Sequence, residues 1–341
     1  MPPRIRPGAA VVAALVLGGC GSERRAEAPP ADAPPATTAA ASPEILTVTA
    51  SDYKFDAPDQ IPAGMVTVQL INRGPSPHHV QLLRLGEGKT LADFQAAVQK
   101  GAMPTWALPA GGPNPPEVGG TSEVRMPLEA GDYVMVCFIP DTAGVPHMAK
   151  GMLRPLQVTA ATGAAASTAD TTADIEMTLV DYDFKLSAPL TPGRHVVRVT
   201  NAAKQPHELV FVRLEPNKTP MDFARWGEHQ VGPAPGTLHG GIAGIMPGTV
   251  AYVAVDLPAG DYALLCFVPD MKDGKPHYAH GMSKRIKLGC AGRSCSWAAS
   301  WCFWSPSLCS SPSACAEGPR RSWSAASGPS SGPPGRSSSP P

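Results

Sequence analysis

Side chains able to bind a soft metal ion recur in the same order in both halves of this 341-residue chain. Each half carries a His, then a Cys, a second His and a Met. The two sets are His78, Cys137, His147 and Met152, and His207, Cys266, His277 and Met282. Two imidazoles, a thiolate and a thioether are the donors of blue-copper electron-transfer sites, in which the Met sulfur is the weak axial contact. Zinc more often takes further Cys residues or a carboxylate, so the pattern favours copper, with one ion in each half.

An internal duplication explains this recurrence. Matching stretches lie 129 residues apart: Asp52-Tyr53-Lys54-Phe55 with Asp181-Tyr182-Asp183-Phe184, Pro77-His78 with Pro206-His207, and Cys137-Phe138 with Cys266-Phe267. The second His and the Met are offset by 130 residues. Self-similarity at a fixed spacing is the signature of a repeated structural unit, so both halves are expected to fold in the same way.

Short strands are predicted to position these side chains. Residues 66–70, 80–85 and 133–137 have an apolar period of two, are rich in β-branched residues, and are bounded by Pro, Gly and Asn, as is typical of strands. Residues 90–99 have helical spacing with Thr90 as the N-cap, and residues 219–226 are their shorter counterpart. Each half is therefore predicted to be mainly a β-sandwich with one short helical insertion.

The alternation of side chains along a strand indicates which residues share a face. Counting by twos places His78 with apolar neighbours and places the adjacent His79 on the opposite face. The second half has Glu208 at the position of His79, so His79 is not expected to be a ligand. The aromatic residues of the first repeated stretch, Tyr53 and Tyr182 among them, are predicted to be core or cross-strand aromatics.

The arrangement resembles the cupredoxin family over residues 46–159 and 174–288. In the first half the matching motifs are Asp52-Tyr53-Lys54-Phe55, Ile61-Pro62-Ala63-Gly64, Pro77-His78, Gly131-Asp132-Tyr133, Cys137, His147 and Gly151-Met152. The resemblance implies two tandem cupredoxin-like Greek-key β-sandwiches, each domain holding copper by its four residues named above.

One feature departs from that family. The second His follows the Cys by 10 residues in the first half and by 11 in the second, a longer interval than blue copper loops usually have. Closure entropy grows only slowly with loop length, so this His can still return to the metal. The loop is nevertheless expected to be less stiff than a short one.

The N-terminus indicates export. Arg4 and Arg6 precede an apolar run at 9–17 that is too short to span a bilayer as a helix. Leu17-Gly18-Gly19-Cys20 resembles a bacterial lipobox, so residues 1–20 are predicted to be a lipoprotein signal peptide with Cys20 as the lipidated residue; an ordinary signal peptide cut nearby is the alternative. The protein is then expected to be exported and lipid-anchored to a bacterial membrane, on its periplasmic or extracellular side.

Three further segments lack the composition of a folded core. Residues 21–45 and 160–173 are rich in Ala, Thr and Ser, with Pro in the first, and are predicted to be a disordered tether and a flexible linker. The tail at 289–341 holds five of the eight Cys residues, at spacings that match no common zinc site. It is predicted to be a disordered low-complexity segment, and we hypothesise that it is an out-of-frame extension.

Charge and motifs narrow the function. Basic and acidic residues number 8 and 10 in residues 46–159, and 12 and 12 in residues 174–288, so no nucleic-acid partner is expected. Tandem cupredoxin-like domains also resemble multicopper oxidases and copper nitrite reductases, but no His-x-His is present, and the chain is predicted not to be an enzyme. The leading hypothesis is a membrane-tethered carrier of single electrons between redox partner proteins. The alternatives are a copper-holding or delivery protein with copper donors and acceptors, and a metal-free binding module.

Overall fold

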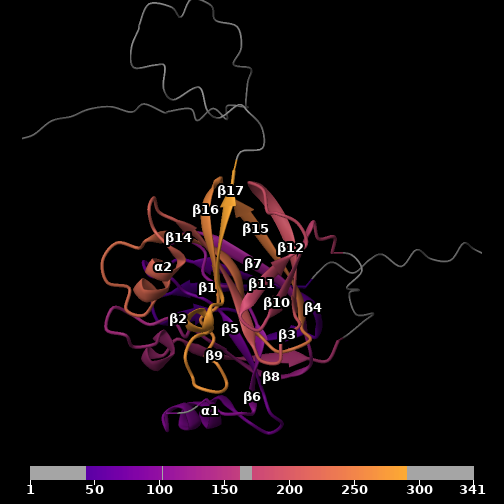
Figure 1. Ribbon diagram of the computed structural model, residues 1–341. Coiled ribbons are helices and arrows are strands. Elements are labelled where there is room, and N and C mark those ends of the chain that lie inside the picture. The colour runs from indigo at the N-terminus through magenta and orange to yellow at the C-terminus, as the bar shows by residue number, and fades with distance from the viewer. Residues whose placement is uncertain (1–43, 102, 162–170, 290–341) are drawn as a thin grey trace, which may run out of the picture.

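The computed structural model describes residues 44–101, 103–161 and 171–289, and nearly all of the regular structure in these ranges is β-strand (Figure 1). The predicted signal peptide with Cys20, the tether up to residue 43, and residues 162–170 of the linker lie outside the described residues, as does the tail beyond residue 289. Within the described ranges, no helix is long and apolar enough to cross a membrane.

The first half contains the elements β1 to β9 and one helix. Their bounds are β1 Glu44–Ser51, β2 Lys54–Asp56, β3 Gln60–Pro62, β4 Gly64–Asn72, β5 Gln81–Leu85, α1 Leu91–Val98, β6 Ala107–Gly111, β7 Thr121–Leu128, β8 Gly131–Val136 and β9 Leu153–Thr159, with a short 3₁₀ helix, η1, at His147–Lys150.

The second half repeats this order, except that its described residues contain no separate counterpart of β3. Its elements are β10 Ile175–Val180, β11 Asp183–Leu186, β12 Gly193–Asn201, β13 His207–Leu214, α2 Pro220–Gly227, β14 Gly236–Ile245, β15 Val250–Leu257, β16 Gly260–Leu265, η3 His277–His280 and β17 Ser283–Leu288.

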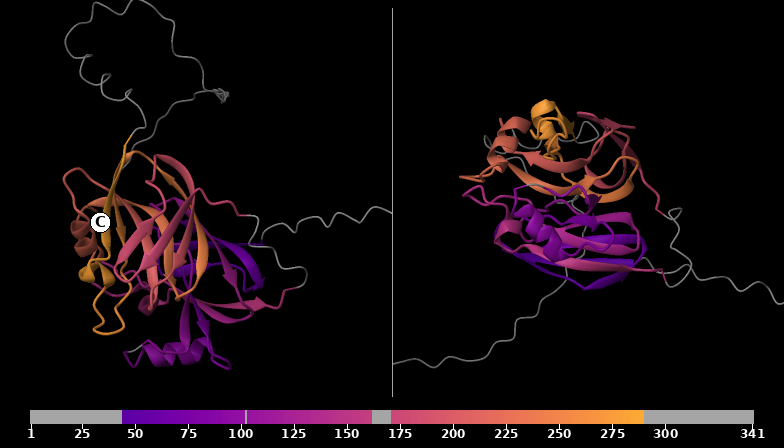
Figure 2. Two further views of the ribbon diagram at one scale, coloured as in Figure 1. Left: turned by 45° about the vertical axis from the view of Figure 1, so that its right-hand side comes forward. Right: turned by 90° about the horizontal axis from the view of Figure 1, so that it is seen from below.

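Both sheets run through both halves. An 8-stranded sheet has the order β11-β10-β12-β15-β7-β4-β1-β2, and a 9-stranded sheet has the order β17-β16-β13-β14-β6-β5-β8-β9-β3. The halves join where β7 pairs antiparallel with β15, centred on Val124 and Val253, and where β6 meets β14 at Ala110 and Ile245. Figure 2 shows the two halves lying against each other along this junction.

The core lies between the two sheets. In β4 the residues Val66, Val68 and Leu70 are fully buried, while Thr67 and Gln69 between them are partly exposed. This alternation lets one face of the strand bury apolar surface at about 25 cal/mol per Å². One hydrophobic cluster draws on strands of both sheets and both halves, and it includes the Cys and the Met of each predicted site.

The two helices begin where the sequence predicted. Thr90 caps α1 and Thr219 caps α2, and each forms a capping box with an Asp three residues later, Asp93 and Asp222. The predicted mainly β fold, with one short helical insertion in each half, is confirmed. The domain boundaries at 46–159 and 174–288 stay a prediction, since the sheets continue from one half into the other.

Candidate metal centres

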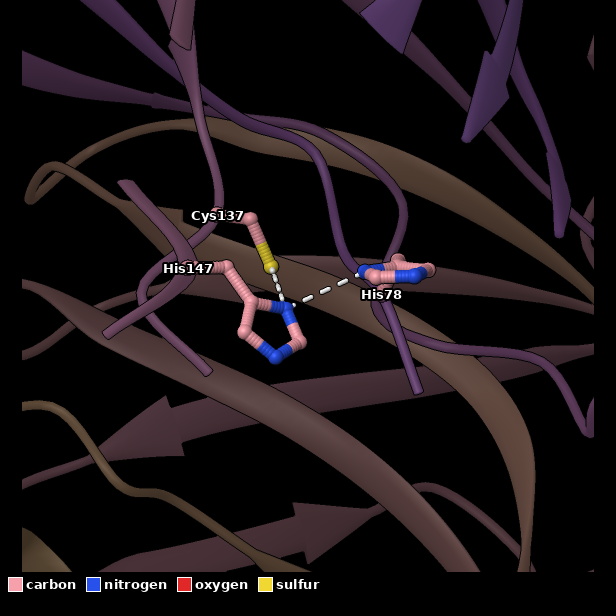
Figure 3. Close-up of side chains that lie close together, drawn as sticks. All are labelled: His78, Cys137 and His147. Carbon is pink, nitrogen blue, oxygen red and sulfur yellow. Dashed lines mark hydrogen bonds between the residues drawn. The ribbon is translucent and has the colours of Figure 1, made fainter. Parts of the chain in front are cut away.

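The first candidate centre brings together three buried side chains from separate elements. Cys137 follows the last residue of β8, His147 opens η1, and His78 lies in the loop before β5. The Cys137 Sγ is 3.6 Å from the His147 Nδ1, and the Nδ1 atoms of the two imidazoles are 3.1 Å apart (Figure 3). One donor atom from each residue lies within 4.8 Å of the other two, so all three can face one ion.

The long interval between Cys137 and His147 is closed by backbone hydrogen bonds. The His147 N–H donates to the Ile139 carbonyl and the Met148 N–H to the Cys137 carbonyl, both at 2.9 Å. At the turn, the Asp141 carboxylate accepts two backbone N–H groups. The loop is therefore a closed hairpin whose ends are tied together, while the expectation that its length makes it less stiff stays a prediction.

The Met of each predicted set is held against its Cys and its second His. The Met152 N–H donates to the His147 carbonyl at 3.0 Å, and the Cys137 N–H donates to the Met152 carbonyl at 3.2 Å. In the left-handed conformation, Gly151 (φ 103°) ends η1 and turns the chain back. The Met152 side chain is fully buried in the shared core.

The second candidate centre repeats this geometry. The Cys266 Sγ lies 3.8 Å from the His207 Nδ1 and 3.3 Å from the His277 Nδ1. The Tyr278 N–H donates to the Cys266 carbonyl, and the Met282 N–H to the His277 carbonyl, both at 2.9 Å. The structure therefore brings each predicted His, Cys, His set together and places each Met in backbone contact with its set.

A carboxylate orients one imidazole of each centre. The His78 Nε2 lies 3.0 Å from Asp52 Oδ1, and the His207 Nε2 lies 2.9 Å from Asp181 Oδ1. Because the carboxylate accepts a hydrogen bond from Nε2–H, the lone pair of Nδ1 is left to face the other donors of its centre, as in metal sites whose ligands are fixed by outer partners. We did not predict these two Asp residues as part of the sites. Their recurrence at the same place in both repeats was the signal.

The tyrosine after each of these Asp residues packs against the core, as predicted, and also lies beside the site. Tyr53 and Tyr182 are partly exposed, and both have left-handed backbone, with φ of 61° and 67°. For a bulky residue this conformation costs about 1–3 kcal/mol. It brings the Tyr53 ring edge-on to His147 at 5.1 Å and the Tyr182 ring to His277 at 5.6 Å.

His79 lies outside the first centre, as predicted. Its side chain is buried on the other side of the chain, and its Nε2 accepts the Phe138 N–H at 2.9 Å. The equivalent Glu208 accepts the Phe267 N–H at 2.7 Å. Burial raises the pKa of Glu208 to about 7.

Burial sets the protonation of the donors. It raises the pKa of the Cys137 thiol to about 12 and that of Cys266 well above its ordinary value. It lowers the pKa of His147 and His277 to about 4, with the neighbouring imidazole adding to the effect. At neutral pH the site thus presents neutral imidazoles and a protonated thiol whose proton a metal must displace.

The donor set fits copper. A thiol and two imidazole nitrogens converge without a carboxylate among them, and the Cys and the Met of each set belong to the same hydrophobic core cluster. Soft sulfur donors with imidazoles select copper, and the surrounding apolar shell tunes its redox potential. When bound, copper would supply one-electron chemistry, and the protein's own groups would fix its geometry.

Comparison with known proteins gives matches among solved structures alone. No protein-family model matches the chain, and no curated protein matches it. Reduced auracyanin from Roseiflexus castenholzii is 19% identical, covering 33% of this chain and 94% of its own, with a TM-score of 0.24. A blue copper oxidase from Nitrosomonas europaea is 13% identical over 72% of this chain and 86% of its own, with a TM-score of 0.22. The copper nitrite reductase of the same organism is 13% identical over 72% and 94%, with a TM-score of 0.21.

These matches correct the prediction that the chain is not an enzyme. An oxidase and a nitrite reductase each align over 72% of it. The absence of a His-x-His motif misled the prediction because metal ligands need not be close together in the sequence. In both centres here the donors belong to separate elements, so the lack of a His-x-His motif does not exclude a catalytic copper.

Removing the carboxylate behind His78 tests its orienting role. We expect Asp52→Ala to weaken copper binding at the first centre by about 10- to 100-fold and to leave the second centre unchanged, because the imidazole loses its fixed orientation. Competition titration with a copper chelator measures both sites. The control, Asp56→Ala, removes an equal charge from an exposed position in β2. Equal effects of the two substitutions would refute the orienting role.

Copper binding should release protons in a number set by the pKa values above. At pH 7 the thiol is protonated and the imidazoles are neutral, so each copper should release one proton and each chain two. Copper affinity should therefore rise with pH through the neutral range, and it should fall more steeply near pH 4, where the imidazoles begin to bind protons. Calorimetry in buffers of different ionisation enthalpy counts the protons. A count of zero would mean that the thiols are not ligands.

Proposed function

We propose that this protein binds one copper ion in each half and carries single electrons through them. The observation that carries the proposal is the duplicated constellation itself, in which a buried thiol lies close to two buried imidazoles, one of them held by an Asp carboxylate, with a buried Met in backbone contact. The ligands at the first centre would be His78, Cys137, His147 and Met152, and those at the second His207, Cys266, His277 and Met282.

The burial of the donors supports an electron-transfer role. Each Cys and each imidazole of the two sets is at most 1% exposed, so a bound ion would be shielded from solvent. A rigid shell that changes little between oxidation states favours fast transfer, and the tied hairpins and the Asp partners supply that rigidity.

A groove beside the first centre is the natural place for a redox partner. It has a volume of about 550 Å³ and is lined by Tyr53, His147 and Lys150 of the first half, and by Trp226 and Gln230 of the second. His147 would thus be the ligand nearest to an electron donor or acceptor seated there. Partner proteins that exchange electrons or copper with the chain are part of this proposal.

The site of action in this proposal is a membrane surface outside the cytoplasm. Lipid on Cys20 would anchor the protein, because more than one acyl chain, each contributing about 0.8 kcal/mol per buried CH₂, holds a protein stably. The predicted tether would then let the two copper sites reach their partners.

Colour tests the proposed function. Loading the purified protein with copper(II) should give two coppers per chain and an intense visible band from thiolate-to-copper charge transfer. Cys137→Ser and Cys266→Ser should each remove the absorption that comes from the altered centre, because serine cannot supply the sulfur. The double substitution should remove the whole band. Each single variant is the control for the other.

The other outcomes identify the competing functions. Colourless copper bound in stoichiometric amounts would contradict electron transfer and support a holding or delivery role. A chain that binds no copper would contradict both and leave a metal-free binding module.

Fractionation tests the membrane anchor. The natural protein should sediment with bacterial membranes, and Cys20→Ser should leave it unlipidated, which mass spectrometry of the N-terminal peptide would reveal. A natural protein whose N-terminal peptide carries no lipid would refute the anchor without touching the copper sites.

A further inference from the structure

A buried chain of polar side chains connects the two candidate centres. His79 and Glu208 each follow the first His ligand of their half, and their side chains make their hydrogen bonds outside their own centre. Both point to Asn114, which lies in the segment between β6 and β7 and reaches from the first half into the second. These three side chains are 8%, 6% and 1% exposed.

Hydrogen bonds join the three side chains without a gap. Because the His79 Nε2 accepts the Phe138 N–H, the proton of the neutral imidazole is on Nδ1, which donates to Asn114 Oδ1 at 3.3 Å. The Asn114 Nδ2 donates to Glu208 Oε2 at 3.3 Å, and Glu208 Oε1 accepts the Phe267 N–H at 2.7 Å. The chain thus runs from the residue after one Cys to the residue after the other.

The chain of hydrogen bonds also reaches the two cysteines, one at its sulfur and one through its backbone. The Glu208 N–H donates to the Cys266 Sγ at 3.4 Å. At the other end, Cys137 is bonded covalently to Phe138, whose N–H donates to the His79 Nε2 at 2.9 Å. From sulfur to sulfur the path therefore crosses Phe138, His79, Asn114 and Glu208, through covalent bonds and four hydrogen bonds.

A structural role accounts for only part of this arrangement. The two hydrogens of the Asn114 Nδ2 are shared among Glu208 Oε2 and the carbonyls of Leu209 and Ile242, and the bonds to the carbonyls secure the junction between the halves. That role needs neither an imidazole nor a carboxyl group, and burying polar groups at an apolar junction is costly unless every one is hydrogen-bonded. Electron tunnelling, by contrast, loses less amplitude through covalent and hydrogen bonds than across van der Waals gaps.

We propose that His79, Asn114 and Glu208 form the path by which one electron passes between the two centres. The inference rests on the proposed function. The transfer oxidises copper(I) at one centre and reduces copper(II) at the other, so one electron moves and no bond or proton changes place. The thiolates are the entry and exit points, because they are the donors most strongly coupled to the metal.

The charges around the two centres set the direction. Beside the second centre, the Asp270 carboxylate is 4% exposed, lies 3.7 Å from the His277 Nε2, and accepts the Tyr182 hydroxyl at 2.5 Å. Beside the first centre, the equivalent Asp141 is paired with Lys150. Unbalanced negative charge stabilises copper(II), so electrons should pass from the second centre to the first, which adjoins the groove.

Pulse radiolysis of the copper-loaded protein tests the path. Met282→Gln, which changes the axial ligand, should lower the potential of the second centre and shift its band, so that the two coppers are distinguished. After a reducing radical has reduced a minority of the copper, the band of the second centre should recover as that of the first bleaches. This phase should be first order, with a rate that does not depend on protein concentration.

Substitutions in the path should slow this phase by an order of magnitude. In the same background, Asn114→Leu removes the central link, and His79→Phe breaks the first link while keeping the ring. The matched control is Gln81→Met, which removes another buried side-chain bond across the junction, from Gln81 to the Gly244 carbonyl, and should leave the rate unchanged. Copper content and both visible bands show whether each variant is folded and loaded.

The outcomes separate this inference from the function on which it rests. Intact bands with redistribution that is unaffected by Asn114→Leu and His79→Phe, or that is proportional to protein concentration, would overturn the path alone. Bands that never form on loading would overturn the proposed function and the path with it.

Discussion

In each half a thiol and two imidazoles share one dry pocket, with sulfur–nitrogen and nitrogen–nitrogen distances between 3.1 and 3.8 Å. Burial favours the uncharged form of every one of these groups, so polar atoms face each other with little solvent to satisfy them. A metal ion relieves this constraint, because it neutralises a thiolate and uses the imidazole lone pairs at once. The surrounding sheets, hairpins and carboxylates all serve to hold these donors in place despite that cost.

The hairpin after each Cys shows how backbone hydrogen bonds can position the second His even though the loop is long. If the ten-residue interval were an open loop, it would not fix the position of His147. Instead, bonds from His147 and Met148 back to the strand end tie the two sides together, and a one-residue insertion in the second half is absorbed at the turn without moving His277. The joined sheets act in the same way on a larger scale, because strand pairing between the halves holds one centre in place relative to the other.

The repeat made most of the donor set predictable. Matching His, Cys, His and Met residues in two halves identify one another, and strand alternation separated His78 from His79 correctly. Three features could not be predicted from the sequence, for physical reasons. The roles of Asp52 and Tyr53 depend on a left-handed backbone turn that period-two patterns do not reveal. The closure of the Cys-to-His loop depends on cross-hairpin hydrogen bonds. Asn114 acts on partners in the other half, about 94 to 128 residues away, and no local pattern encodes such a contact.

The most direct measurement of the central claim is copper K-edge X-ray absorption of the fully loaded protein. The geometry predicts two coppers per chain, each with one short sulfur neighbour and two imidazole nitrogens, and a spectrum that loses its sulfur contribution when Cys137 and Cys266 are both replaced by serine. Copper surrounded by nitrogen and oxygen alone in the unaltered protein would contradict the account.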